Sequence, residues 1–126
     1  MDAAQALADL TEISSQVEAA VLFDASGEVT ASTLSGDQDA AALARAAGEL
    51  LARASELGDS GEVTQVEAST PNGSVFVVSD GSRRIAATTA ADPTTGLVFY
   101  DLKSCLRDSE PKARRKRAAK KDGDEA

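Results

Sequence analysis

The alternation of apolar and polar residues along the chain predicts eight elements, in the order helix, two strands, long helix, three strands, helix. Apolar residues that recur every three or four positions indicate the helices, and short apolar or alternating runs between turn residues indicate the strands. The predicted helices cover residues 3–16, the segment between Ser35 and Gly58, and a segment that starts at Asp92. The predicted strands cover residues 17–24, 28–34, 62–69, 74–80 and 84–90.

Turn and cap residues support several of these boundaries. Gly27, at the end of Asp24-Ala25-Ser26-Gly27, is able to take a positive φ and predicts a hairpin between the first two strands. The Asn-Gly pair in Thr70-Pro71-Asn72-Gly73 predicts a second tight turn. Asp92 is expected to cap the last helix, because Pro93 suits the first helical position.

The first strand has apolar residues on both faces. Val17, Ala19, Val21 and Phe23 alternate with Ala20 and Leu22. A strand that is apolar on both sides is typical of a central position in a sheet that is covered on two faces.

The two shorter helices each have one predicted buried side. In the last helix it comprises Val98, Leu102, Cys105 and Leu106, and in the first helix it comprises Ala3, Ala6, Leu7, Leu10 and Ile13.

The long helix carries two stripes of apolar or small residues. A surface helix needs only one apolar stripe, and a leucine stripe (Leu43, Ala47, Leu50, Ala54, Leu57) is sufficient to pack it on the sheet. A small-residue stripe (Ala40, Ala44, Gly48, Leu51, Ser55) is then left over. Glycine costs about 1 kcal/mol relative to alanine inside a helix. One explanation for Gly48 is that the same helix of a second chain approaches closely at this position. The alternative is that alanine is simply abundant in this chain and that Gly48 has no role.

Two further surfaces stand out. The remaining face of the long helix carries Arg45, Glu49, Arg53 and Glu56, and Glu49 and Arg53 have the spacing of a favourable ion pair. The third strand, in which Val63, Gln65, Glu67 and Ser69 share one face, is more polar than its neighbours and is predicted to be an edge. An edge strand is able to pair with its own copy, or to be protected from pairing by charges such as Glu62 and Glu67.

Composition and charge narrow the classes of partner. The 126 residues fit one domain at residues 1–110, followed by a basic tail at 111–126 that is predicted to be disordered. The first segment holds 18 acidic and 6 basic residues, for a net charge of −12, whereas the tail has a net charge of +4. An acidic body repels nucleic acid and anionic membranes, so no specific nucleic-acid partner is predicted and only the tail would contact an acidic surface.

Several kinds of chemistry lack the residues that they need. The chain has no histidine and a single cysteine, which argues against acid–base catalysis and a zinc site, and no P-loop motif is present. We therefore predict no catalytic residue, cofactor or metal. The lone Cys105 is expected to be a small core residue of a cytoplasmic protein, because no signal peptide or membrane span is evident. Arg83-Arg84 after a turn is either a small anion clamp or a solubilising pair.

The chain resembles the Roadblock/LC7 family, and in particular its short bacterial members. The resemblance covers residues 6–108 and rests on VLFDASGEV at 21–29, Leu50-Leu51 in the alanine-rich helix, SVFVV at 74–78, IAATTA at 85–90 and DPTTGLVFYDL at 92–102. It implies an α+β, profilin-like fold in which helices cover both faces of a five-stranded antiparallel sheet. It also implies a homodimer, or a heterodimer with a sister chain, formed through the long helix and the third strand.

Family members bind small Ras-like GTPases as regulators or scaffolds and are not usually enzymes, so the resemblance implies the same here. The expected dimer interface comprises Ala40, Ala44, Gly48, Leu51, Ser55, Val63, Gln65 and Glu67. The expected GTPase-facing residues are Arg45, Glu49, Arg53 and Glu56. The alternative is a small-molecule-sensing or adaptor module of profilin- or GAF-like shape, although an alanine-rich core argues against a roomy pocket.

Overall fold

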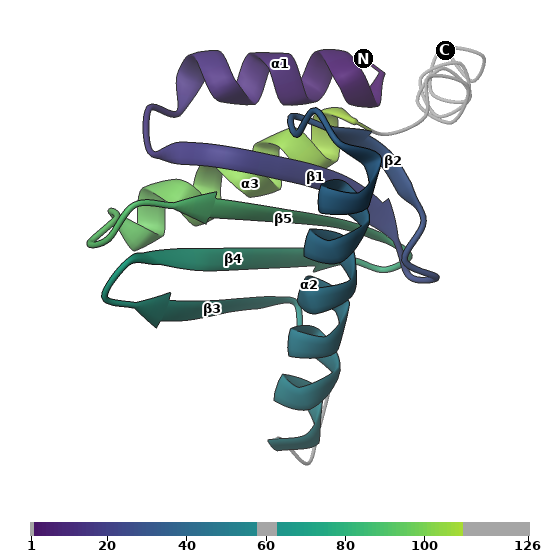
Figure 1. The fold of residues 1–126 in the computed structure, drawn as a ribbon, viewed down its shortest axis with the longest axis vertical. Helices are drawn as coiled ribbons and strands as arrows, with labels where there is room; N and C mark the ends of the chain where they lie inside the picture. The colour runs from purple at the N-terminus through teal and green to yellow at the C-terminus, as the bar shows by residue number, and fades with distance from the viewer. Residues whose placement is uncertain (1, 58–62, 110–126) are drawn as a thin grey trace, which may run out of the picture.

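The computed structural model describes residues 2–57 and 63–109, and it contains the eight predicted elements in the predicted order (Figure 1). The helices are α1 (Ala3–Ile13), α2 (Asp37–Leu57) and α3 (Thr95–Asp108). The strands are β1 (Val17–Asp24), β2 (Val29–Ser32), β3 (Gln65–Thr70), β4 (Gly73–Asp80) and β5 (Arg83–Thr89).

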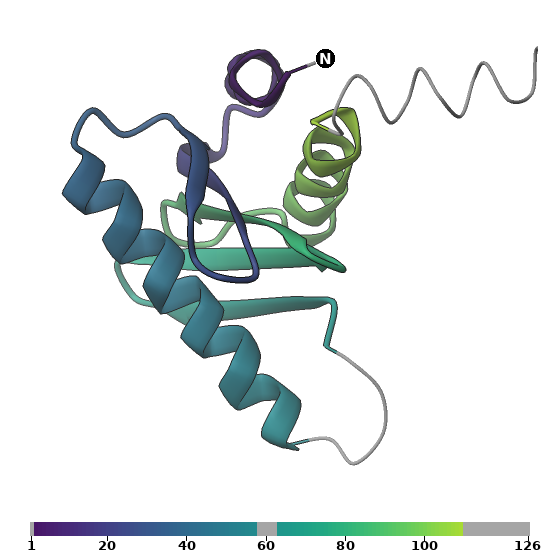
Figure 2. The ribbon, with the colours of Figure 1, turned by 90° about the vertical axis from the view of Figure 1, so that its right-hand side faces the viewer.

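The strands form one antiparallel sheet in the order β2-β1-β5-β4-β3. The helices α1 and α3 cover one face of this sheet, and α2 crosses the other face (Figures 1 and 2). The predicted fold class is therefore confirmed. The predicted edge position of β3 is confirmed as well, because β3 ends the sheet opposite β2.

Two separate cores hold the layers together. Leu7, Leu10 and Leu102 pack against Phe76 and Ile85 on the α1/α3 face. The rings of Phe76 and Phe99 meet edge to face there, with their centroids 5.0 Å apart. On the α2 face, the sheet contributes Val21, Phe23, Val77 and Ala86, while the helix contributes Ala40, Ala44, Ala47 and Leu51. The α2 face is thus the thinner core, with alanine as its main helical component.

A bulge in β1 changes one predicted side-chain direction. The register of β1 against β5 shifts between Val17 and Ala19. Such a bulge moves the preceding residue to the other face of the sheet. Val17 therefore packs with Ala20 and Leu22 in the α1/α3 core, and its predicted grouping with Val21 and Phe23 was wrong.

Two helix ends also differ from the prediction. The helix α1 ends at Ile13 rather than at residue 16, and Ile13 is 73% exposed, so the buried stripe stops at Leu10. The helix α3 starts at Thr95 instead of near Asp92, which has a φ of 60° and cannot act as the cap. The N–H of Thr94 donates to Oε1 of Gln16 at 2.6 Å, which ties this helix start to the loop after α1.

The Asn-Gly turn before β4 is present as predicted, and its glycine is required. Gly73 has a φ of 155°, and a Cβ atom built on it would lie 2.4 Å from the carbonyl oxygen of Thr89. No side chain fits so close to a backbone oxygen. The glycine therefore allows β4 to begin directly beside the end of β5.

Some predictions concern residues that the structure does not describe. These are the helix stop at Gly58, the start of the third strand at Glu62, the boundary at residue 110 and the basic tail at 111–126. Within residues 2–57 and 63–109, no helix has both the length and the apolar character needed to cross a membrane.

Candidate interaction surface on the second helix

The side of α2 that packs on the sheet is centred on the small-residue stripe and includes only part of the predicted leucine stripe. Ala40, Ala44, Ala47 and Leu51 are at most 4% exposed and form the contact with the sheet. Leu43 and Leu50 are only half-buried, and Leu57 is 90% exposed. The prediction that the leucine stripe packs on the sheet is confirmed for Ala47 and in part for Leu43 and Leu50, which border the same core, and it was wrong for Leu57. Because Phe23 and Val77 supply the bulk of this core, the helix approaches through its smallest side chains.

This orientation changes the predicted dimer interface. Ala40, Ala44 and Leu51 were assigned to it, but they have almost no surface left outside their own chain. The other residues of the predicted interface retain surface: Gly48, Val63 and Glu67 are half-buried, and Ser55 and Gln65 are exposed. For these five residues, contact with a second chain stays a prediction.

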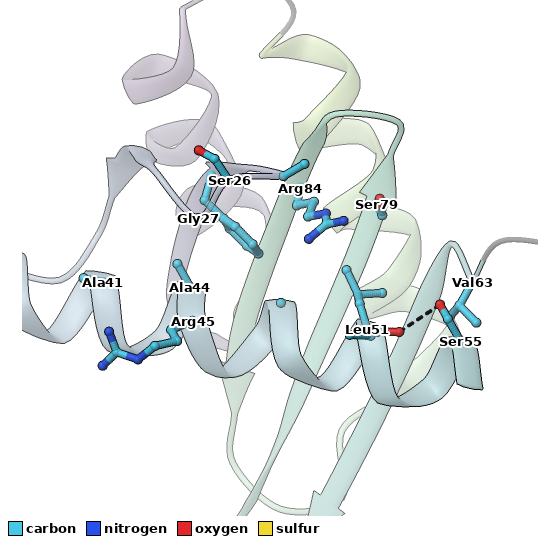
Figure 3. Close-up of a pocket in the computed structure, with 14 residues that line it drawn as sticks. Ser26, Gly27, Ala41, Ala44, Arg45, Leu51, Ser55, Val63, Ser79 and Arg84 are labelled. Carbon is cyan, nitrogen blue, oxygen red and sulfur yellow. Dashed lines mark hydrogen bonds between the residues drawn. The ribbon is translucent and has the colours of Figure 1, made fainter. Parts of the chain in front are cut away.

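The surroundings of Gly48 within its own chain are open. A Cβ atom at this position would have one heavy atom within 4 Å outside its own helix, Nη1 of Arg84 at 3.8 Å. Arg84 extends from β5 toward α2 (Figure 3). A distance of 3.8 Å is an ordinary contact, so the packing of one chain does not require a glycine here, and a close approach of a second chain at Gly48 stays a prediction.

The outward face of α2 carries the four charged residues that were expected to face a GTPase. Arg45, Glu49, Arg53 and Glu56 are all exposed. Nη1 of Arg53 lies 3.7 Å from Oε1 of Glu56, so Arg53 pairs with Glu56 and not with Glu49 as predicted. An exposed pair of this kind is worth about 0–1 kcal/mol, so all four charges remain available for a partner.

The two flanks of α2 differ. At 100° per residue, Ala46, Leu50 and Leu57 lie on one flank, which we call the leucine flank, and Ala41, Gly48, Ala52 and Ser55 lie on the other, the glycine flank. The end of α2 that carries Leu57 projects past β3, the edge strand (Figures 1 and 2). The leucine flank therefore exposes a large apolar side chain, whereas the glycine flank borders a groove.

Arg83 and Arg84 point to opposite faces of the sheet, as successive strand residues do. Arg83 lies on the α3 side, where its Nη1 donates to Oγ of Ser109 and its Nη2 to the carbonyl oxygen of Leu106, both at 2.8 Å. These bonds hold the C-terminal end of α3. The two arginines therefore cannot form one clamp, and that alternative was wrong.

Two other ionisable groups serve the fold. Oδ1 of Asp24 accepts hydrogen bonds from the Ser26 hydroxyl and from the backbone N–H groups of Glu28 and Ser26, and these bonds lower the pKa of Asp24. Burial, together with Asp108 and Asp9, raises the pKa of Cys105 to about 12. Cys105 is thus a buried core residue, as predicted. In the described part of the chain, no three His, Cys, Asp or Glu residues gather as a metal site would require.

A family model named Roadblock/LC7 domain matches residues 3–90. The chain belongs to the Roadblock/LC7 family. This match spans α1, the whole sheet and α2, and it therefore includes the helix that carries the charged face and both flanks. No match was found among curated proteins.

Solved structures share the Roadblock/LC7 fold at low sequence identity. A Roadblock/LC7 domain from Streptomyces avermitilis is 19% identical, with a TM-score of 0.78 over 88% of this chain and 97% of the other. MglB from Myxococcus xanthus is 15% identical, with a TM-score of 0.63 over 83% and 85%. An MglB with a tetrameric arrangement is 19% identical, with a TM-score of 0.61 over the same shares.

Proposed function

We propose that this Roadblock/LC7 chain is a non-enzymatic, dimeric regulator or scaffold that binds a small Ras-like GTPase. The observation that carries the proposal is the outward face of α2. Its four charged side chains are exposed, they stand on one rigid helix, and the sheet packs against the opposite side. Membership in a family associated with regulatory and adaptor roles, rather than catalysis, supports this reading of the surface.

The charge pattern suits recognition better than simple attraction. Two arginines and two glutamates share the face, so a partner has to present acidic and basic groups in matching positions. Such charge complementarity contributes mainly to specificity and to the rate of encounter. Because the body of the chain is strongly acidic, Arg45 and Arg53 are the residues on this helix that attract the acidic groups of a partner.

The dimer is proposed to form through the leucine flank of α2 and the outer edge of β3. The side of β3 away from β4 has no strand partner among the described residues, and a free edge is able to pair with a second strand. Leu57 adds an exposed apolar side chain beside this edge. The tetrameric arrangement of one MglB structure is consistent with self-association of the fold.

The GTPase proposal is tested with the full chain and a panel of small Ras-like GTPases, each loaded with GDP or with a non-hydrolysable GTP analogue. We expect at least one GTPase to bind, and the double variant Arg45→Glu/Arg53→Glu to weaken binding at least ten-fold. Lys103→Glu/Arg107→Glu is the matched control, because it makes the same charge change at two exposed positions of α3. The absence of binding in either nucleotide state, or equal losses in both variants, refutes the proposal.

The same assay separates a regulator from a scaffold. For a GTPase that binds, the rates of GTP hydrolysis and of nucleotide release are measured with and without the chain. A change in either rate that is lost in Arg45→Glu/Arg53→Glu identifies a regulator. Unchanged rates together with binding identify a scaffold.

A further inference from the structure

A groove lies along the glycine flank of α2, between this helix and the turn after β1 (Figure 3). Its volume is about 550 Å³, which falls in the range of about 300–1,000 Å³ that is typical of small-molecule sites. Phe23 and Leu51 supply apolar surface, and Gly27 and Gly48 leave the groove open. The alanine-rich composition argued against such a space, but short side chains at the surface create a groove because they do not fill it.

Arg84 places a positive charge in this groove. Its side chain extends from β5 between the sheet and α2, and its guanidinium lies against Gly48 (Figure 3). The Nε atom is buried and has no hydrogen-bond partner, and no acidic residue of the described chain pairs with this guanidinium. A buried donor without an acceptor is costly, and more so when it belongs to a charged group.

The remaining lining favours an anion at this one position. Among the described residues, no carboxylate lines the groove, although the body of the chain is strongly acidic. Two of its three hydroxyl groups already donate at close range, Ser55 to the carbonyl oxygen of Leu51 at 2.9 Å and Ser26 to Asp24 at 2.5 Å. Arg45 also lines the groove, but it is exposed, and in Figure 3 it points away from Arg84. Arg84 is therefore the main donor available to a ligand.

We propose that this groove binds a small organic monocarboxylate, with the carboxylate on Arg84 and its apolar body against Phe23, Leu51 and Val63. A guanidinium has the planar donor geometry that suits a carboxylate. One inward-pointing arginine balances one negative charge, which favours a monocarboxylate over a doubly charged phosphate ester. The apolar lining distinguishes such a ligand from a free inorganic anion.

This site goes beyond the proposed GTPase function and is independent of it. Gly48, Ser55 and Val63 line the groove and also belong to the dimer interface predicted from the sequence. The dimer contact proposed above uses the leucine flank instead, and the proposed GTPase contact centres on the charged outer face. A ligand in the groove touches α2 directly. The position of the groove therefore allows ligand occupancy to affect the same helix that is proposed to bind partners.

The test uses the full chain with 4-phenylbutyrate as the probe, followed by ¹H–¹⁵N NMR. We expect the amide signals of Gly27, Gly48 and Ala52 to shift, with a Kd of about 1 mM or tighter. The neutral analogue 4-phenylbutan-1-ol has the same apolar body and is expected to bind at least ten-fold more weakly. Acetate and inorganic phosphate, which lack that body, are expected to produce no saturable shift at these positions.

Variants identify the residues responsible. Arg84→Gln is expected to weaken probe binding at least ten-fold, and Arg84→Lys to weaken it less because the charge is retained. Gly48→Leu fills the groove and is expected to abolish binding, whereas Arg53→Gln removes an equal charge outside the groove and is expected to change the Kd less than two-fold. Dispersed NMR spectra confirm that each variant is folded.

Three results would overturn the proposal. The first is equal binding of the acid and the alcohol, which would make the groove a purely apolar site. The second is unchanged probe binding in a folded Arg84→Gln variant. The third is a lack of probe binding while Arg84→Gln alters the mass of the assembly or the affinity for a GTPase, which would assign the groove to a protein partner. A failed GTPase panel leaves the outcome of the probe titration unaffected.

Discussion

The two faces of the sheet are covered by helices that pack through side chains of different size. On the α1/α3 face, two helices supply large side chains, and the rings of Phe76 and Phe99 pack edge to face. Arg83 on this face uses its guanidinium to hydrogen-bond the end of α3. On the α2 face, a single helix packs through alanines and leaves Arg84 in an open groove. The first face is built for stability. The second has smaller packed side chains and more accessible surface, and it carries the proposed ligand site, the proposed GTPase contact and the helical part of the proposed dimer contact.

The largest expected effect comes from truncating one leucine on each face. Leu102 is fully buried under α3, so Leu102→Ala leaves a closed cavity and is expected to cost about 4 kcal/mol, within the usual range of 2–5 kcal/mol. Leu51 lines the groove, so Leu51→Ala only enlarges an existing opening and is expected to cost about 2 kcal/mol. Urea denaturation measures both free energies of unfolding. Equal costs would show that the α2 face is as tightly closed as the other.

The second prediction concerns the proposed dimer. Leu57→Glu places a charge on the leucine flank and is expected to raise the dimer dissociation constant at least ten-fold, which corresponds to about 1.4 kcal/mol. Ile13→Glu makes the same kind of change at an apolar residue of α1 that is 73% exposed, and it is expected to have no effect. Light scattering over a range of concentrations measures the mass. A wild-type chain that is monomeric throughout, or a dimer insensitive to Leu57→Glu, contradicts the proposed interface.

Gly48 provides a smaller and sharper test of the α2 face. A Cβ atom there would make an ordinary contact with Arg84 at 3.8 Å, so Gly48→Ala is expected to stabilise the fold by about 1 kcal/mol through helix propensity. Ala52→Gly, at an exposed position of the same helix, is expected to lower stability by about the same amount. A destabilising Gly48→Ala would mean that the guanidinium of Arg84 cannot adjust, or that another chain does contact Gly48.

Local signals were sufficient to predict the order of elements. The Asn-Gly turn, the hairpin at Gly27 and the doubly apolar first strand each depend on residues that are close in sequence. The resemblance to the Roadblock/LC7 family then supplied the arrangement of the layers, which periodicity alone does not determine. Errors at helix ends, such as that at Asp92, arose where a backbone turn rather than a side-chain cap sets the boundary.

The orientation of α2 was not predictable from its own sequence. Its two stripes are equally plausible by periodicity, and the choice between them depends on Phe23 and Val77, which lie in other elements. The bulge that turns Val17 to the other face is likewise a property of the paired strands. The position of Arg84 in the groove was not predictable either, because it depends on which face of β5 the residue occupies and on which side of α2 faces it. Candidate sites built from a single helix are therefore less predictable than the helix itself.

Cys105 tests how completely the α1/α3 face is closed. Its Sγ lies 3.4 Å from the carbonyl oxygen of Ala6, and its pKa is raised to about 12 from an ordinary value of 9.0. Because the unfolded chain releases this proton at lower pH than the folded chain, stability is fully present below about pH 9 and falls as the pH rises from 9 toward 12. The free energy of unfolding, measured by urea denaturation at each pH, is expected to fall less steeply between pH 9 and 12 in Cys105→Ala. A thiol reagent is expected to modify the native chain only through unfolding. Rapid modification of the native chain would show that this face opens as readily as the one that α2 covers.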